Sequence, residues 1–385
     1  MSINLSRNTR LWISTENKDG SHTNANTFEI PIQEGYSLSQ SVSTTDVSVE
    51  EAGATPIRGS KRFNTSRDPV DWSFTTYMSP YLSATIHYMV DMLLWHSLAS
   101  SKDTATDFDN LDGITKVFGD ATSFKVGFSN NSAHVLTELY LYFEVDKTMY
   151  YIDKAQVSQA ELSIDISDIA QTAWSGQGLT YTPIPSPAFV AAGSNTFDEV
   201  APVSGFVGIP ANKTYLVNKL TLLNLNSDMA PARSAGINDN YNIPITSGSI
   251  TINNNITYLT PNTLAEVDAP IGSFTGSFEV TGTIEAYLRD NAGADGTTGS
   301  AYGSADLLAH MLANVSNAVT NAANVVFKVG GGNGARVEIT VPAAHLSIPD
   351  LSIDDVVSTS IEFKGIPSSP DLVSGDEVSL AMFAE

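Results

Sequence analysis

The sequence contains no cysteine, few charged residues and no long apolar run. The lack of cysteine excludes disulfide bonds, thiolate zinc sites and cysteine nucleophiles. No segment approaches the roughly 18 consecutive apolar residues that a membrane-spanning helix needs. The first residues, MSINLSRNTRLWIST, also lack the apolar core of a secretory signal. We therefore expect a soluble chain with no membrane span.

The few charges are mostly acidic. They make up 16% of the chain, and 42 acids against 19 bases give a formal net charge of −23. Acids exceed bases in both halves, so the charge is spread along the chain. A uniformly acidic protein repels phosphates at long range, which argues against specific binding or wrapping of DNA but not against DNA moving past it.

The length and the residue pattern predict several β-rich domains. A chain of 385 residues exceeds the usual size of one domain. Most of it consists of short segments rich in Val, Ile, Thr, Tyr and Phe, broken by Gly, Asn, Asp, Ser and Pro, as is typical of β-strands. The clearest predicted strands are 9–14, 70–78, 138–145, 249–259, 274–288 and 335–341. Alternation of Val337, Ile339 and Val341 predicts that the last of these is half-buried.

Two segments have the spacing of an α-helix instead. The apolar positions of the first are Ile86, Met89, Val90, Leu93, Leu94 and Leu98. Those of the second are Leu308, Met311, Leu312 and Val315, after a predicted N-cap at Ser304. Each half of the chain is therefore expected to hold one helix.

Short matches recur in the same order in both halves, which indicates an internal duplication. Ile30-Pro31-Ile32 matches Ile243-Pro244-Ile245, Pro56-Ile57 matches Pro270-Ile271, and the strand from Trp72 to Tyr81 matches that from Phe278 to Tyr287. Phe124-Lys125-Val126-Gly127 recurs as Phe327-Lys328-Val329-Gly330, Leu162-Ser163-Ile164-Asp165 as Leu351-Ser352-Ile353-Asp354, and Thr172 with Gly178 as Thr359 with Gly365. The predicted division is a first copy at 1–182, a Pro/Gly/Ser-rich linker at 183–212 and a second copy at 213–385.

Three parts of the second copy, together with one of the first, resemble the tail tube proteins of long-tailed bacteriophages. These are ITINNNITYL at 250–259, Pro270-Ile271-Gly272 with GSFEVTGTIEAY at 276–287, STSIEFKG at 358–365 with Gly375-Asp376-Glu377, and EEAGATPIRG at 50–59. The resemblance implies a mainly β fold of two tandem antiparallel β-sandwich or barrel domains, each with one flanking α-helix. It also implies self-association through sheet edges into rings, either a pseudo-hexameric trimer or a hexamer, which stack into a hollow tube.

The same resemblance implies a virion protein of the tail, assembled in the host cytoplasm, that contacts other tail proteins and lets DNA pass without specific binding. An acidic lumen would favour such passage because like charges repel. Three polar segments, 15–27, 228–241 and 291–302, are candidates for contacts between stacked rings, although ordinary surface loops are the simpler interpretation of each.

The sequence predicts no catalytic, cofactor-binding or metal-binding residue. The six histidines, at 22, 87, 96, 134, 310 and 345, show no HxH or HExxH spacing. Asp103, Asp107, Asp109 and Asp112 lack the full ligand set of a calcium loop, so we expect a solvated acidic loop, with weak calcium binding as the alternative. The glycine-rich run 330–334 lacks the lysine and hydroxyl of a P-loop and predicts a hairpin turn.

The remaining charged groups have simple structural interpretations. Adjacent acids, such as Glu50-Glu51 and Asp354-Asp355, point to opposite faces of a strand and cannot flank one bond. The basic cluster Arg58, Lys61, Arg62 and Arg67 is interpreted as a solvated loop, with contact to an acidic neighbour as the alternative. We therefore predict a non-enzymatic tube subunit. The main alternative is a β-rich binding module, such as a tail fibre or an adhesin that recognises carbohydrate, and a hydrolase ranks third.

Overall fold

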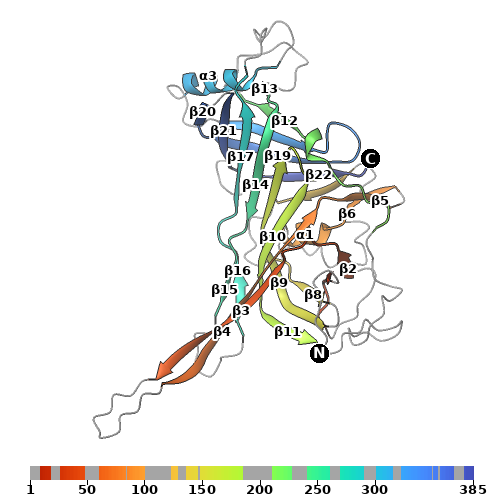
Figure 1. Ribbon diagram of the computed structural model, residues 1–385, viewed down its shortest axis with the longest axis vertical. Helices are drawn as coiled ribbons and strands as arrows, with labels where there is room; N and C mark the ends of the chain where they lie inside the picture. The colour runs from red at the N-terminus through yellow and green to blue at the C-terminus, as the bar shows by residue number, and fades with distance from the viewer. Residues whose placement is uncertain are drawn as a thin grey trace, which may run out of the picture.

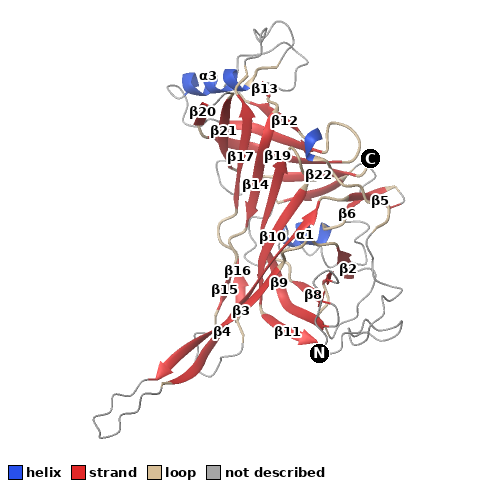
Figure 2. Ribbon diagram, in the orientation of Figure 1, coloured by secondary structure: helices blue, strands red, loops and turns tan. Residues whose placement is uncertain are grey.

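The computed structural model is mainly antiparallel β-structure, as the sequence predicts (Figures 1 and 2). It describes residues 9–18, 27–47, 60–83, 85–99, 123–128, 136–145, 148–184, 210–227, 241–260, 269–289, 301–314, 322–348, 350–353, 356–367 and 377–385. No helix within these ranges is long and apolar enough to cross a membrane.

In the described residues, each half contains one α-helix among its strands. The elements of the first half are β1 (Thr9–Ser14), β2 (Thr27–Ile30), β3 (Ser37–Val47), β4 (Lys61–Tyr77), β5 (Pro80–Ser83), β6 (Ile86–Met89), α1 (Met92–Ala99), β7 (Phe124–Gly127), β8 (Leu139–Val145), β9 (Thr148–Asp165), β10 (Gln171–Gly178) and β11 (Thr180–Ile184). Those that follow are the 3₁₀ turn η3 (Asn218–Leu220), β12 (Leu222–Asn226), β13 (Tyr241–Asn242), β14 (Ile245–Asn253), β15 (Thr257–Leu259), β16 (Gly272–Phe274), β17 (Glu279–Tyr287), α3 (Ser304–Asn314), β18 (Ala322–Val329), β19 (Arg336–Leu346), β20 (Asp350–Ile353), β21 (Val357–Gly365) and β22 (Ser379–Phe383).

Eight antiparallel strands form one continuous wall along the molecule. Their order is β3-β4-β10-β9-β14-β17-β21-β20. The first four belong to the first half of the chain and the last four to the second half. The two halves meet where β9 pairs with β14, from Gln159 opposite Asn253 to Asp165 opposite Ser247.

A second layer of strands packs against this wall. Its order is β2-β1-β8-β9-β11 in the first half and β13-β12-β18-β19-β22 in the second, where β7 of the first half pairs with β22. Strand β9 belongs to both layers, because its first part pairs with β8 and β11 and its last part with β10 and β14. Strand β19 likewise passes from β18 and β22 to β21.

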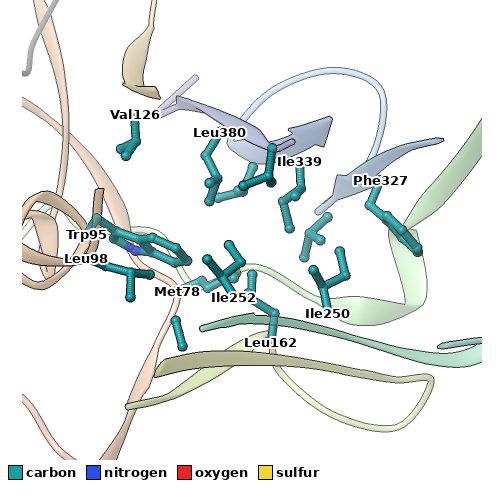
Figure 3. Packing of buried hydrophobic residues seen from close by; sticks show 14 of the residues in the cluster. Met78, Trp95, Leu98, Val126, Leu162, Ile250, Ile252, Phe327, Ile339 and Leu380 are labelled. Atoms are coloured by element: carbon teal, nitrogen blue, oxygen red, sulfur yellow. The ribbon is translucent and has the colours of Figure 1, made fainter. Parts of the chain in front are cut away.

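The hydrophobic core lies between the two layers and spans both halves. Figure 3 shows Leu162, Ile250 and Ile252 of the wall opposite Ile339 and Leu380 of the second layer. These residues belong to one contiguous buried cluster that also takes in α1. The core therefore joins the two halves, as the strand pairing also does.

The two halves repeat the same order of strand pairing. In the first half the ladder runs β2-β1-β8-β9-β10-β4-β3, and in the second it runs β13-β12-β18-β19-β21-β17-β14, with β20 adding to the end of β21. The helix falls between the equivalent strands β4 and β8, and β17 and β18. Strands β11 and β22 also correspond, since each pairs with the long strand β9 or β19.

Some of the sequence matches coincide in this ladder and others do not. Leu162 lies opposite Thr172, and Leu351 lies opposite Thr359, so these matches hold residue by residue. The two FKVG segments occupy different places: the first is β7, which pairs with β22, whereas the second ends β18. Strand β8 pairs with β1, and β18 pairs with the equivalent strand β12. By these pairings, the counterpart of Phe327 in the first half is Phe143.

The predicted strands 9–14 and 138–145 agree with β1 and β8 within one residue, whereas β4 begins nine residues before the predicted 70–78 and β19 ends five residues after the predicted 335–341. Both helices also differ in detail. Residues 86–89 form strand β6 in a hairpin with β5, and the helix begins only at Met92. Every residue of α1 is buried, so its apolar residues do not mark a single face of the helix. The apolar spacing therefore predicted a start of the helix that is too early. In α3, the Ser304 hydroxyl donates to the Tyr287 carbonyl instead of capping the helix, and Leu312 is 56% exposed.

A close approach at Gly282 provides a test of the wall. A Cβ at this position would lie 2.3 Å from the Phe363 ring and 2.5 Å from the Ser249 carbonyl oxygen. We expect Gly282→Ala to lower the free energy of unfolding by about 2 kcal/mol or more, because overpacking a core forces its neighbours apart. Gly272→Ala is the matched control, since nothing lies within 4 Å of its Cβ. Urea unfolding of both variants measures the difference, and equal stability would contradict this packing.

Candidate functional surface: the polar face of the eight-stranded wall

The eight-stranded wall has one apolar face and one polar face. Because side chains alternate along a strand and cross-strand partners share a face, the observed pairing assigns each residue to a side. The polar face comprises Ser37, Ser39, Asp71, Ser73, Thr75, Tyr77, Gln159, Glu161, Ser163, Asp165, Gln171, Ala173, Ser175, Gln177, Ser247, Ser249, Thr251, Asn253, Glu279, Thr281, Thr283, Glu285, Tyr287, Asp350, Ser352, Ser358, Ser360, Glu362 and Lys364. Hydroxyl, amide and carboxylate groups dominate this set.

The polar face is strongly acidic. It carries seven carboxylates, Asp71, Glu161, Asp165, Glu279, Glu285, Asp350 and Glu362, and Lys364 is its one base among the described residues. Lys364 is already paired, because its Nζ lies 2.6 Å from Glu279 Oε1. The face therefore presents negative charge without a free cation in the region that the strand pairing covers.

Short hydrogen bonds hold several of these carboxylates. Ser247 Oγ donates to Glu285 Oε2 at 2.5 Å, and Gln177 Nε2 donates to Asp71 Oδ1 at 3.0 Å. The backbone N–H and the hydroxyl of Ser167 both donate to Asp165 and hold the pKa of that carboxyl below its usual value. Hydrogen bonds of this kind favour the ionised form of the Asp165 carboxyl.

A shallow hollow of about 300 Å³ opens on this face near β3, β4 and β10. Ser37, Asp71, Ser73, Ser175 and Gln177 line it, together with Trp72, Ser158, Gly176 and Ile256. No histidine or lysine is among these residues, so none of the serines has the base that a nucleophile needs. Within the described ranges, no group of three or more His, Asp or Glu residues is placed to hold a metal ion.

A buried polar network ties helix α1 to the apolar side of the wall. Thr76 of β4 donates to Asp91 Oδ2 at 3.0 Å and accepts from Trp174 Nε1 of β10 at 2.9 Å. Asp91 lies in the turn before α1, and its carbonyl accepts from the N–H groups of Leu94 and Trp95. Burial raises the pKa of the Asp91 carboxyl to about 7, and the hydrogen bond from Thr76 partly opposes this shift.

The structure disperses the histidines that the sequence analysis considered. His87 lies on β6, His96 on α1, His310 on α3 and His345 on β19, whereas His22 and His134 lie outside the described residues. Burial lowers the pKa of His96 to about 2, so this side chain packs as a neutral group. His87 Nδ1 accepts from the Ala384 N–H, and His310 Nδ1 is 2.8 Å from the Tyr241 hydroxyl.

The other segments that the sequence analysis considered are described only in part. Asp103 to Asp112, Glu50-Glu51, Asp354-Asp355, Arg58 and most of the three polar segments lie outside the described residues. Gly330–Gly334 forms the turn between β18 and β19, as predicted, with positive φ at Gly330, Gly331 and Gly334. Lys61, Arg62 and Arg67 lie on strand β4 and not in a loop. Arg62 donates to both oxygens of Asp46 at 2.7 and 2.9 Å.

Sequence reasoning missed the polar face, although its signal is present. Ser247, Ser249, Thr251 and Asn253 alternate with apolar residues along β14. The pattern identifies a two-faced strand, but only the pairing shows that eight such strands place their polar sides together.

Comparison with known proteins gives two matches. The family described as phage tail tube protein matches residues 42–365. The tail tube protein pb6 of Escherichia phage T5 is 40% identical over 382 residues, which cover 98% of this chain and 75% of that protein.

The Asp91 network predicts a specific pH dependence of stability. The folded chain holds a proton on Asp91 up to about pH 7, whereas an unfolded aspartate releases it near pH 4, so the contribution of this group to stability falls between these values. We expect the wild type to lose up to about 1.4 kcal/mol per pH unit across this window relative to Asp91→Asn, and nothing further above it.

Urea unfolding of both proteins at pH 5, 6, 7 and 8 measures the effect. Asp71→Asn is the control on the polar face, where the carboxylate is not enclosed in the core. A constant difference between wild type and Asp91→Asn at all four pH values would contradict the buried protonated carboxyl.

Proposed function

We propose that this chain, which belongs to the phage tail tube protein family, closes with further copies of itself into a ring whose lumen is lined by the polar face of the wall. Members of this family are structural proteins of the virion tail and not enzymes. The observation that carries the proposal is the wall itself, because one of its faces is sealed by the core while the other is hydrophilic and acidic.

Ring closure follows from the two ends of the wall. In the described parts of the chain, β3 pairs with β4 alone and β20 pairs with β21 alone, so each end presents an edge of backbone N–H and C=O groups. Exposed edges invite further pairing, and closure into a barrel removes them. Copies of this chain joined edge to edge would therefore form one barrel with eight strands from each copy.

Barrel geometry favours three copies. Strands about 4.8 Å apart and tilted by about 40° add roughly 6 Å each to the circumference. After about 5 Å is subtracted for side chains on each side, two copies leave a lumen of roughly 20 Å, three of roughly 40 Å and six of roughly 85 Å. A B-form duplex about 20 Å across passes freely only from three copies upward. Three is the smallest sufficient number, and six leaves far more space than the duplex needs.

The two halves are proposed to be tandem tube domains, at 1–182 and 213–385, joined by the linker at 183–212. Their common ladder order supports the duplication, and each supplies four strands to the wall. Strand β11 runs to Ile184, two residues into the proposed linker. A ring of three chains would then contain six similar domains with pseudo-hexameric symmetry.

The polar face suits the passage of DNA. Carboxylates repel phosphates, and a surface without free cations offers no counterion release to hold the duplex. Stacked rings would extend this lumen into a tube. Tyr77 and Tyr287 are the aromatic residues of the face and lie on different strands, so it does not form the aromatic platform that the alternative, a carbohydrate-binding module, requires.

Electron microscopy of the purified full chain tests the proposal directly. We expect hollow rings or tubes with threefold symmetry and a lumen of roughly 40 Å. Monomers or solid oligomers at every protein concentration and salt condition tested would overturn it.

Charge reversal on the polar face tests the role of the lumen. We expect tubes of Glu161→Lys/Glu362→Lys to retain duplex DNA at low salt and to release it at high salt, whereas wild-type tubes retain none. The matched control is Glu34→Lys/Glu385→Lys, which makes the same change in net charge at two acids outside the face. Co-sedimentation of labelled duplex with tubes gives the bound fraction, and equal retention by both variants would place the face outside the lumen.

A further inference from the structure

We propose that β20 of one chain pairs with β3 of the next copy in the register that β9 and β14 use inside the chain. The inference rests on the proposed ring and specifies its contact. The junction between the halves would thus be the template for the junction between chains.

The internal junction is fully observed. β9 and β14 pair without interruption, with Ser163 opposite Ser249 and Leu162 opposite Ile250. Leu162 is 1% exposed and Ile250 is 0% exposed, and both lie in the common core (Figure 3). The serines occupy the polar face, so this junction continues both faces of the wall without a break.

The strand ladders identify the equivalent residues at the free ends. Leu351 of β20 corresponds to Leu162 of β9, because they lie opposite Thr359 and Thr172, respectively. Leu38 of β3 corresponds to Ile250 of β14 by the same procedure. Leu38 pairs with Trp72, which also pairs with Gly176, four residues beyond Thr172. In the same way, Ile250 pairs with Gly282, which also pairs with Phe363, four residues beyond Thr359.

Exposure distinguishes the free end from the completed junction. Leu351 is 46% exposed, whereas its counterpart Leu162 is 1% exposed. In the first half β14 covers this position, while in the second half no described strand pairs with the outer edge of β20. A strand added at that edge would bury an apolar side chain and satisfy a row of backbone groups. The β3 strand of another copy fits this edge, because it is the counterpart of β14. Among the described strands, β3 pairs only with β4, so its other edge is open.

The template fixes the register of the contact between copies. Leu38 of one copy would lie opposite Leu351 of the next on the core side, as Ile250 lies opposite Leu162. Ser37 would lie opposite Ser352 on the polar side, as Ser249 lies opposite Ser163. The polar face would therefore cross the boundary between chains without a change of chemistry.

The long β3–β4 hairpin fits the same arrangement. Its outer part leaves the body at the lower left of Figure 1, and Val42, Val47 and Phe63 are exposed there. The corresponding hairpin of the second half, β15–β16, instead lies against the first half, where Tyr258 donates to the Lys154 carbonyl and Ser273 to Gln156 Oε1. An isolated two-stranded hairpin is marginally stable in water. A neighbouring copy would cover this hairpin as the first half covers β15–β16.

Engineered disulfides test the register, and the absence of native cysteine makes the background clean. Directly opposite residues have Cβ atoms about 5 Å apart, close to the separation that a disulfide requires. We expect mild oxidation of assembled Ser37→Cys/Ser352→Cys to give covalent oligomers up to the closed ring on a non-reducing gel. Ser163→Cys/Ser249→Cys, at the internal junction, should form its disulfide within one chain and stay monomeric on the gel.

The control for register is Ser41→Cys/Ser352→Cys, which shifts one cysteine by four residues along β3. If microscopy shows tubes but Ser37→Cys/Ser352→Cys stays monomeric after oxidation, this contact is wrong and the tube function stands. The same conclusion follows if the shifted pair cross-links equally well. Absence of any ring from the unmodified chain would instead overturn the proposed function.

Discussion

The pairing of β9 with β14 is the interaction on which the rest of the architecture depends. It joins strands from opposite halves of the chain by a ladder of backbone hydrogen bonds, and it places Leu162 beside Ile250 in the common core. Without this ladder, the wall would divide into two four-stranded parts and have four edges with unpaired backbone groups. With it, the described wall has two edges, and these lie at its ends.

Alternation along each strand gives the two faces of the wall separate roles. Residues such as Phe74, Leu162 and Ile284 pack into the core, and their direct neighbours in sequence carry the hydroxyls and carboxylates of the polar face. A shift of one residue in any strand would exchange the faces, so the register that stabilises the core also determines the surface. The wall of this tail tube family member therefore combines a buried apolar face with an exposed face that carries seven carboxylates.

The sequence predicted the β-rich fold, the family and, within the described residues, one helix in each half, because these depend on local periodicity and on short motifs. It predicted the start of the first helix wrongly, because every residue of α1 is buried and β6 has an apolar pattern that also fits a helix. The FKVG match misled for a different reason: β7 and β18 have the same residues at different places in the ladder. The polar face was not predicted at all, since it arises from pairings between strands as distant in sequence as β10 and β4.

The covalent link between the halves also has a thermodynamic consequence. Two halves on one polypeptide meet at an effective concentration set by their connection, so their shared sheet forms without the loss of translational and rotational freedom that separate subunits incur. In the proposed ring, a chain that carries four strands from each half reduces the number of separate bodies that must meet. The halves also differ visibly, because the β3–β4 hairpin projects from the body whereas the β15–β16 hairpin packs against the first half.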